Sequence, residues 1–342
     1  MIAESTSRRP RVFSGIQPSG TLHIGNYLGA IRRWVAQQDE KENYFCIVDM
    51  HAITVLQDPE LLRRLTRDVA ALYIASGLDP QKSTVFVQSH VRAHAECCWI
   101  LNCVTPIGWL ERMTQFKTKA RQRESVSTGL LDYPVLQAAD ILLYDTDQVP
   151  VGEDQKQHVE LTRDIAQRFN RIYGETFVLP EAVIPESGAR IRALNDPTRK
   201  MSKSEMHIRG HAVRLIDKAD EIRYVIRRAV TDTGREIVFS DAPEKAGVNN
   251  LLEIYELLTG KRRPAIEAHF EGRGYAVLKE KVTEVVIEAL RPIRERYHEL
   301  TSDRAELDRI LVAGAERARS VAEPKIQEIR RKVGFIFVHG HT

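Results

Sequence analysis

Two short segments of the chain carry residue types that are suited to binding phosphate. The first reads PSGTLHIGN and runs from Pro18 to Asn26. Gly20 and Gly25 would let the backbone approach a ligand closely, and His23 and Asn26 can donate hydrogen bonds. A helix that follows such a turn offers unpaired N–H groups to an anion. By itself, a glycine-bearing turn of this kind is more often only a turn than a phosphate site.

The second segment reads KMSKS and runs from Lys200 to Ser204. Its two lysines, Lys200 and Lys203, flank the hydroxyl of Ser202. Lysine acts on phosphate as a point charge, and serine adds a hydrogen-bond donor. A basic run is usually a solvated surface loop. Here the basic run indicates a phosphate site because both segments occur, in this order, on one α/β chain.

The elements that must position these segments alternate between strands and helices. Apolar runs predict strands at 12–16, 44–48, 84–87 and 149–151, and helical spacing predicts helices at 27–35, 61–73 and 153–170. This alternation favours right-handed crossovers and a parallel sheet. Because ligands of such sheets bind at the carboxyl ends of the strands, Asp49 and His51 should share one rim with the first segment.

The rest of the chain is predicted to be mostly helical. Residues 93–144 have helical texture, and a loop rich in Pro, Gly and Arg covers 185–204. Long amphipathic helices follow, with examples at 251–258, 282–297 and 306–321. The composition changes near residue 205. We therefore expect an α/β domain over residues 1–204 and an α-helical domain over residues 205–342.

Composition places the chain in the globular class. It has 342 residues, 43% hydrophobic and 28% charged, and its net charge of +3 allows a nucleic-acid partner without indicating one. The cysteines, at 46, 97, 98 and 103, form no C-x-x-C pair, so we expect free thiols in a reducing compartment and no structural metal. The polar N-terminus and the lack of any run near ~18 apolar residues indicate a cytoplasmic protein that does not enter a membrane.

The two segments together resemble the signatures of class I aminoacyl-tRNA synthetases. His23 to Asn26 is similar to the HIGH signature, with Asn in fourth place as tryptophanyl members commonly have, and Lys200 to Ser204 matches KMSKS without change. Further segments resemble the tryptophanyl members: FSGIQPSG at 13–20, IVDMHAIT at 47–54, RMTQFK at 112–117, AADILLY at 138–144 and VGEDQKQH at 151–158. The resemblance extends from about residue 11 to about residue 320.

This resemblance implies an architecture and an activity. The expected fold is a Rossmann-type catalytic domain over 1–204, with a helical dimer-interface insertion at about 93–145, followed by an α-helical anticodon-binding domain over 205–342. The expected reaction is activation of L-tryptophan by ATP with Mg²⁺, giving tryptophanyl-adenylate and pyrophosphate, followed by transfer of tryptophan to tRNA(Trp). A homodimer is expected, and the apolar region from Ala95 to Leu110 is the candidate interface.

The resemblance also implies roles for individual residues. Charge neutralisation during catalysis is expected from Lys200, Ser202, Lys203, Lys119 and Gln17. ATP is expected to contact Gln17, His23, Gly25, Asn26, Asp154, Ile191, Lys200, Met201 and Lys203. The tryptophan pocket is expected to comprise Phe13, Gly15, His51, Tyr133, Gln137, Asp140, Val149, Val151 and Gln155. Asp140 would accept the indole N–H, and Tyr133 and Gln155 would bind the α-ammonium group.

The choice of amino acid has to be argued from single residues. Asp140 lies in an otherwise apolar run, where a carboxylate is costly unless it is paired or binds a ligand. Tyr133, Gln137 and Asp140 fall at the Y-x-x-x-Q-x-x-D spacing of tyrosyl enzymes, whereas Phe13 and Gln17 depart from the tyrosyl pattern. We favour tryptophan. The alternatives are a tyrosyl enzyme, a synthetase-like binding protein that does not charge tRNA, and a generic nucleotidyltransferase.

Overall fold

A parallel sheet forms the centre of the protein. The computed structural model of the chain describes residues 8–18, 22–120, 126–152, 155–184 and 191–337. Within these ranges the strands form one five-stranded sheet in the order β3-β2-β1-β4-β5. They are β1 (Arg11–Ile16), β2 (Glu42–Ile47), β3 (Ser83–Val87), β4 (Gln148–Pro150) and β5 (Glu181–Val183). The α/β expectation is confirmed. The sequence does not predict β5, because it begins with the charged and exposed Glu181 and adds only Ala182 and Val183 as apolar residues.

Both faces of the sheet are covered, which explains why its strands read as nearly continuous apolar runs. In β2, Phe45 and Ile47 belong to one buried cluster, and Tyr44 and Cys46 belong to the other. β1 pairs with β2 so that Phe13 lies beside Tyr44. The first cluster is completed mainly by helices from the N-terminal and C-terminal parts of the chain. The second cluster is completed mainly by helices from the middle of the chain.

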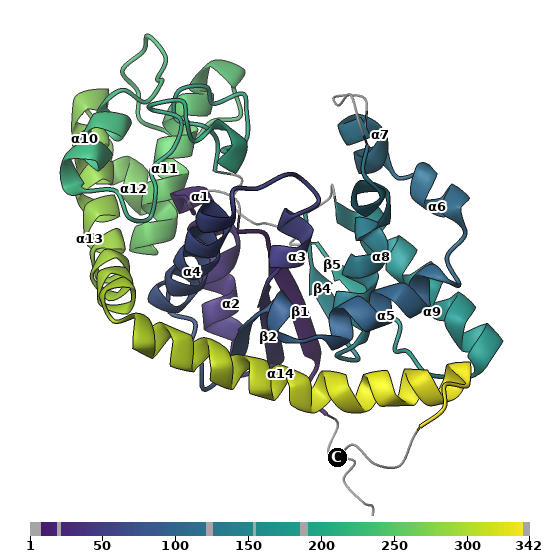
Figure 1. The fold of residues 1–342 in the computed structure, drawn as a ribbon. Helices are drawn as coiled ribbons and strands as arrows, with labels where there is room; N and C mark the ends of the chain where they lie inside the picture. The colour runs from purple at the N-terminus through teal and green to yellow at the C-terminus, as the bar shows by residue number, and fades with distance from the viewer. Residues whose placement is uncertain (1–7, 19–21, 121–125, 153–154, 185–190, 338–342) are drawn as a thin grey trace, which may run out of the picture.

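The first face carries a helix that leaves the carboxyl end of β1, together with the helices of the C-terminal half. That helix consists of α1 (Ile24–Asn26), the π-helical turn η1 (Tyr27–Ile31) and α2 (Arg32–Gln37). The others are α4 (Pro59–Ala75), α10 (Ala219–Arg227), η5 (Pro243–Lys245), α11 (Ala246–Thr259), α12 (Arg263–Phe270) and α13 (Tyr275–Ser302). Figure 1 shows α10 to α13 gathered at one side of the sheet.

The second face is covered by helices from the middle of the chain, as the helical texture of 93–144 predicts. They are α5 (Ala93–Asn102), α6 (Ile107–Glu111), α7 (Thr114–Ala120), α8 (Thr128–Leu142) and α9 (Lys156–Tyr173). Two short helices, α3 (Asp49–Ala52) and η2 (Gln88–His90), directly follow β2 and β3. Within the described ranges, no helix is both long enough and apolar enough to cross a membrane.

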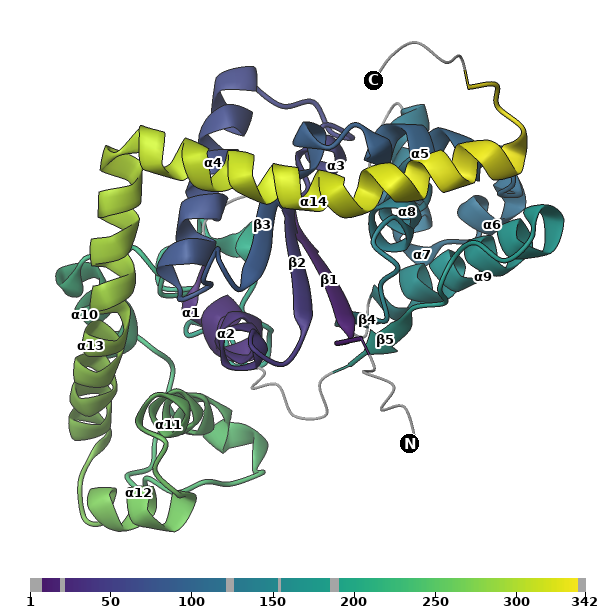
Figure 2. The same ribbon diagram turned by 90° about the horizontal axis from the view of Figure 1, so that it is seen from below.

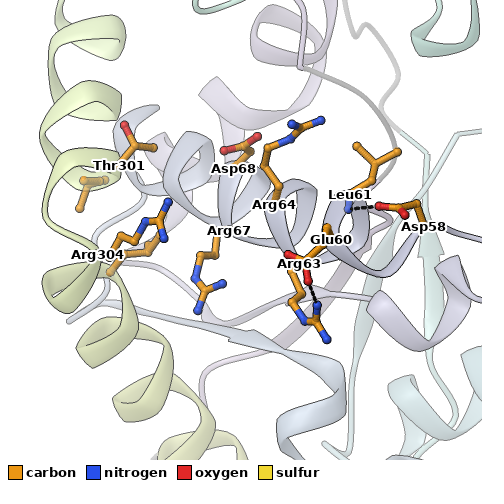
Figure 3. A pocket seen from close by; sticks show the side chains of 11 residues that line it. Asp58, Glu60, Leu61, Arg63, Arg64, Arg67, Asp68, Thr301 and Arg304 are labelled. Carbon is orange, nitrogen blue, oxygen red and sulfur yellow. Dashed lines mark hydrogen bonds and ion pairs between the residues drawn. The ribbon is translucent and has the colours of Figure 1, made fainter.

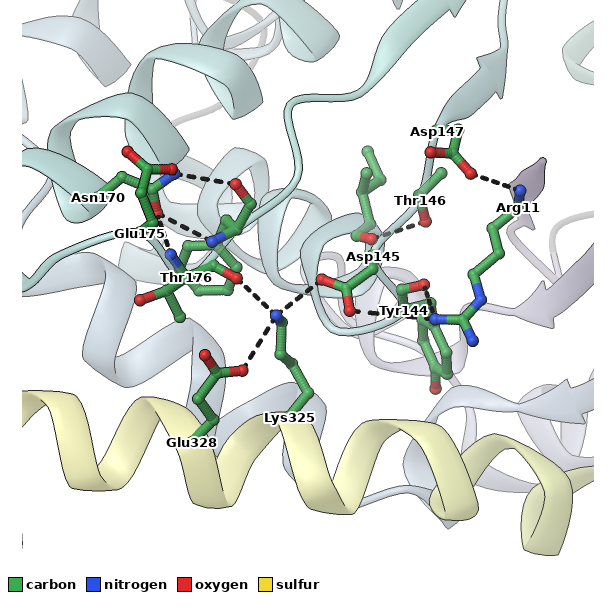
Figure 4. Close-up of polar contacts among 12 residues, drawn as sticks. Arg11, Tyr144, Asp145, Thr146, Asp147, Asn170, Glu175, Thr176, Lys325 and Glu328 are labelled. Carbon is green, nitrogen blue, oxygen red and sulfur yellow. Dashed lines mark hydrogen bonds and ion pairs between the residues drawn. The ribbon is translucent and has the colours of Figure 1, made fainter. Parts of the chain in front are cut away.

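The last helix, α14 (Arg304–Val333), returns to the sheet and runs past its strands (Figure 2). It lies so close to β3 that a Cβ atom built on Gly314 would be 1.9 Å from the carbonyl oxygen of Val85. Farther along, the buried Lys325 ammonium bonds to the Thr176 carbonyl at 2.5 Å and pairs with Asp145 at 2.7 Å (Figure 4). These contacts join the end of the chain to its first half, and the boundary near residue 205 stays a prediction.

Candidate active site

The candidate site lies where the strand order changes direction. The chain passes from β1 outward through β2 to β3, then returns to the other side of β1 with β4. A parallel sheet opens a crevice at such a switch point, and ligands bind there. A cavity of about 560 Å³ lies between the β1–β4 side of the sheet and the α1–α2 helix. The predicted residues that line it are His23, Gly25, Asn26, Val151, Ile191, Lys200 and Met201.

The two segments predicted to bind phosphate meet in this cavity, although about 175 residues separate them. A Cβ atom on Gly25 would lie 3.3 Å from the Met201 sulfur and 3.0 Å from Nδ1 of His23, so a larger residue at 25 would crowd both. The first segment is also tied to the chain beyond the second. The N–H of Ile24 donates to the Val213 carbonyl at 2.9 Å. The prediction that these segments form one site is therefore supported by their packing.

The cavity is cationic. Arg33, Lys41, Arg192 and Lys200 line it, and no carboxylate occurs among the described residues of its wall. Burial, followed by the charges of Lys203, His211 and Lys200, lowers the pKa of His23 to about 3. His23 is therefore a neutral imidazole at physiological pH and contributes hydrogen bonds instead of charge.

The pKa of Lys203 is also shifted. Burial lowers the pKa of its ammonium to about 8, because the charged form loses hydration. An incoming phosphate would favour the charged form again. Binding an anion would therefore offset a desolvation cost at Lys203 that the exposed Lys200 does not carry.

The KMSKS loop is held against the body at two points. Met201 is buried, and its N–H donates to the Ile191 carbonyl at 3.3 Å. The N–H of Ser202 donates to Nε2 of His211 at 3.0 Å. The short helix η4 (Lys203–Glu205) follows. The loop therefore has a defined position in this structure.

A buried polar network surrounds Asp140 on the other side of β1. Asp140 is 1% exposed, and its Oδ2 lies 2.8 Å from Nε2 of His51. Its Oδ1 accepts a hydrogen bond from the Gln88 amide at 2.7 Å and lies 2.6 Å from Nδ1 of His94. The other ring nitrogen of His94 lies 2.8 Å from the Tyr144 hydroxyl. Three protein donors thus pair with Asp140, which explains how a carboxylate is stable in this buried position.

Hydrogen bonds keep Asp140 ionised despite its burial. Burial alone would raise its pKa, but the bonds from His51 and His94 outweigh that effect and lower the pKa to about 2. Gln88 is oriented for its bond by the Met50 N–H, which donates to the Gln88 side-chain oxygen at 3.1 Å. The result is a fixed negative charge at the carboxyl ends of β2 and β3.

The remaining predicted pocket residues fall into two groups. Phe13 and Val149 are buried with the Asp140 network, and the Phe13 ring stacks on Tyr144 with centroids 5.6 Å apart. His158 Nε2 lies 3.0 Å from the hydroxyl of the buried Tyr133. The other group is more open: Gln17 and Gly15 are exposed, and Gln137 and Gln155 are half-buried.

Two predicted residues cannot be placed. Asp154 lies outside the described residues. Lys119 belongs to α7, but its side chain is outside those that the structure describes. Their assignments to ribose and to the phosphates stay predictions.

Sequence reasoning missed several residues of the site. Gln88 could have been found, because it directly follows β3 and so lies at the carboxyl rim of the sheet. His94 and His211 carry no local signal, since each is a lone histidine whose partner is far away in the sequence. Arg33 and Lys41 also line the cavity, and no motif in the sequence marks them.

A second hollow lies away from the predicted site (Figure 3). It has a volume of about 510 Å³ and lies between α4 and the α13–α14 corner. Arg63, Arg64, Arg67 and Arg304 line it together with Asp58, Glu60 and Asp68. None of the predicted site residues contributes to its described wall. Its mixed charges do not match the cationic lining of the first cavity.

Comparisons with known proteins show what the chain as a whole is similar to. The family described as tRNA synthetases class I (W and Y) matches residues 5–291. A tryptophan–tRNA ligase of Caldanaerobacter subterraneus is 54% identical over 326 residues, which cover 95% of this chain and 98% of the relative. One from Wolinella succinogenes is 52% identical over 329 residues, covering 96% and 99%. The crystal structure of Campylobacter jejuni tryptophanyl-tRNA synthetase complexed with ADP and tryptophan has 39% identity and a TM-score of 0.84, covering 95% of this chain and 100% of that one.

Proposed function

The chain belongs to the class I tRNA synthetases for tryptophan and tyrosine, and from this premise we propose how its residues divide the reaction. It is a tryptophan–tRNA ligase, which activates L-tryptophan with ATP and transfers it to tRNA(Trp). Tryptophan–tRNA ligases are 52% and 54% identical to this chain over nearly its full length, which supports tryptophan over tyrosine as the substrate. The observation that carries the ATP chemistry is the meeting of Gly25 and Met201 in one cationic cavity.

We propose that ATP occupies this cavity as its magnesium complex. Mg²⁺ in such sites is held largely by substrate phosphates and water. Gly25, Ile191 and Met201 would pack the adenine, since Ile191 and Met201 are buried and apolar and Gly25 adds no side chain. His23 and Asn26 would donate hydrogen bonds toward the phosphates. Asp154 would bind the ribose.

The first step needs no nucleophile from the protein. The carboxylate of tryptophan attacks the α-phosphorus of ATP, the bond to the β-phosphate oxygen breaks, and pyrophosphate leaves. The protein contributes position and charge. Lys200, Ser202 and Lys203, with Lys119 and Gln17, would neutralise the charge that develops on the phosphates. Lys203 would do so from a desolvated position, whereas Lys200 is exposed.

We propose that tryptophan binds on the Asp140 side of β1. Phe13, Val149 and Val151 would contact the indole ring, and Gly15 and Gln137 would complete the wall. A carboxylate offers about four acceptor positions, and His51, Gln88 and His94 occupy three of them. The fourth position, on Oδ2, would take the indole N–H, and Tyr133 and Gln155 would bind the α-ammonium group.

In the second step, the 2′-OH of the terminal adenosine of tRNA(Trp) attacks the carbonyl carbon of tryptophanyl-adenylate, and AMP leaves. The α-helical region over 205–342 would bind the anticodon. We propose a cytoplasmic location, where ATP and tRNA are present. The free thiols of Cys46, Cys97, Cys98 and Cys103 suit the reducing conditions there.

We also propose a homodimer through the α5–α6 surface. Trp99 and Ile107 are 68% and 62% exposed on these two helices, and a dimer contact there would remove both apolar side chains from water. Trp109, which falls in the same predicted interface, is only half exposed and packs on the second core cluster. Trp99 and Ile107 are thus the better positions to test.

Amino-acid-dependent exchange of labelled pyrophosphate into ATP tests the proposed function. Each of the twenty amino acids is supplied separately to the wild-type protein. We expect exchange with tryptophan, and rejection of phenylalanine, whose ring carries no donor, by roughly 10⁴ or more, because the site demands a buried hydrogen bond. Exchange with tyrosine would keep the class and overturn the substrate. Lack of exchange from folded protein that still binds ATP would favour a non-catalytic binding protein.

The pH dependence of exchange tests Lys203. Because its ammonium has a pKa of about 8, kcat/KM for ATP should decline as pH rises through 8 and the charge is lost. Lys203→Arg keeps its charge, so the decline should move to higher pH. Lys218→Arg, at an exposed position before α10, is the matched control and should follow the wild type. An unchanged alkaline decline in Lys203→Arg would contradict the assignment.

Sedimentation velocity tests the dimer. The double variant Trp99→Glu with Ile107→Glu should sediment as a monomer, because it would place charges in a desolvated contact. Val312→Glu, at a 52% exposed position on α14, should leave the dimer intact. The proposed surface is wrong if the double variant stays folded and dimeric.

A further inference from the structure

His211 is a buried histidine that the reaction described above does not use. It is 1% exposed and follows Gly210, whose φ of +90° forms a tight turn. Both of its backbone groups are fixed: its N–H donates to the Ile208 carbonyl at 3.1 Å, and its carbonyl accepts from the Leu194 N–H at 2.9 Å. The backbone that carries the ring is therefore held by main-chain bonds on both sides, nine residues after Ser202.

The contacts of the ring determine which nitrogen carries the proton. The Ser202 backbone N–H can only donate, and it points at Nε2 of His211 from 3.0 Å. Nε2 must therefore be an unprotonated acceptor, and Nδ1 must carry the hydrogen. Nδ1 lies 3.2 Å from Oδ1 of Asn195 and 3.5 Å from the Glu205 carboxylate, and both groups accept hydrogen bonds. The tautomer is thus fixed at both ends.

The Ser202 bond acts at the centre of the KMSKS loop. Other backbone bonds described for this loop are longer: Met201 to Ile191 at 3.3 Å, Glu205 to Ser202 at 3.4 Å and Met206 to Lys203 at 3.3 Å. Ser202 lies between the exposed Lys200 and the desolvated Lys203. The bond to His211 therefore sets where both ammonium groups stand relative to the cavity.

We infer that His211 is a positioning residue that latches the KMSKS loop through its neutral imidazole, and that protonation of this imidazole releases the loop. The predicted effect on catalysis rests on the proposed function. The predicted effect on the position of the loop rests on the hydrogen bond alone. A protonated ring would turn an N–H toward the Ser202 N–H, so the acceptor would be lost. Positioning errors of about 1 Å can lower a rate by about 10²-fold.

The surroundings of His211 keep it neutral near pH 7. Burial lowers its pKa, Glu205 raises it, and Arg199 and His207 lower it, with a net shift below the ordinary value. Glu205 is partly neutralised by its own ion pair with Arg199. The titratable groups that face His211 come from three segments: Asp196 and Arg199, Glu205 and His207, and His23 of the first signature. The latch should thus hold at neutral pH and fail only in acid.

Two substitutions separate the latch from simple packing. His211→Leu removes the acceptor. His211→Gln keeps an oxygen that can reach the Ser202 N–H and does not titrate. We expect the Leu variant to lower kcat for tryptophan-dependent pyrophosphate exchange by roughly 10- to 100-fold, with tryptophan affinity in the absence of ATP unchanged. The Gln variant should recover most of the rate. His298→Leu, at an exposed position on α13, is the matched control and should behave as the wild type.

The pH profile supplies a readout that a merely structural role would not move. Wild-type exchange should decline on the acid side as His211 takes up a proton, and His211→Gln should lack that decline. Wild-type kcat in His211→Leu would overturn the inference. It would equally be overturned if His211→Gln were as slow as His211→Leu while both fold and bind tryptophan.

Amide hydrogen exchange tests the hydrogen bond between Ser202 and His211 without measuring activity. The Ser202 N–H should be protected in the wild type and in His211→Gln, and should exchange much faster in His211→Leu. Equal protection in all three proteins would refute the latch. If the wild type showed no pyrophosphate exchange with any amino acid, the proposed function would fail while this measurement still decided the inference.

Discussion

The ionised carboxylate of Asp140 is the constraint on which the site depends. A charge buried among apolar helices is stable only if donors surround it. Here the donors come from separate elements: His51 from α3, Gln88 from η2 and His94 from α5, while Asp140 itself belongs to α8. The hydrogen bonds that stabilise this charge therefore join the carboxyl ends of β2 and β3 to the helices that cover the second face. The wall of the proposed tryptophan pocket would depend on these contacts, because Phe13 and Val149 pack in the same cluster.

The switch point between β1 and β4 separates two kinds of chemistry. On one side lies a cavity lined by cations and by small or apolar residues, which suits the phosphates and base of a nucleotide. On the other side lies a fixed negative charge within an aromatic cluster, which suits a ring that carries a hydrogen-bond donor. The reacting carboxylate and the α-phosphorus would meet between them. Because the lysines proposed to serve this junction lie on a loop, the hydrogen bond from the Ser202 N–H to His211 would decide where their ammonium groups stand.

The sequence predicted much of the fold because the signals were local. Apolar runs located β1, β2, β3 and β4, and helical spacing located α4 and α9 to within a few residues. Single long-range contacts could not be foreseen. The return of α14 to the sheet depends on Gly314 packing against Val85 and on the buried ion pair of Lys325 with Asp145. Likewise, the spacing of motifs gave Lys200 and Lys203, but it could not give His94 or His211, whose partners are set by tertiary packing.

The central claim is that Asp140 both organises the pocket and selects the indole N–H. Calorimetric binding of tryptophan and of the analogue with sulfur in place of the ring N–H, to wild type and to Asp140→Asn, tests it most directly. The wild type should prefer tryptophan by about 1–3 kcal/mol, the cost of an unmade buried hydrogen bond. Asp140→Asn should lose this preference, because its amide oxygen would face His94 and Gln88 and its NH₂ would meet the indole N–H. If Asp140→Asn weakened both ligands equally and kept their ratio, Asp140 would be structural only and the account would be contradicted.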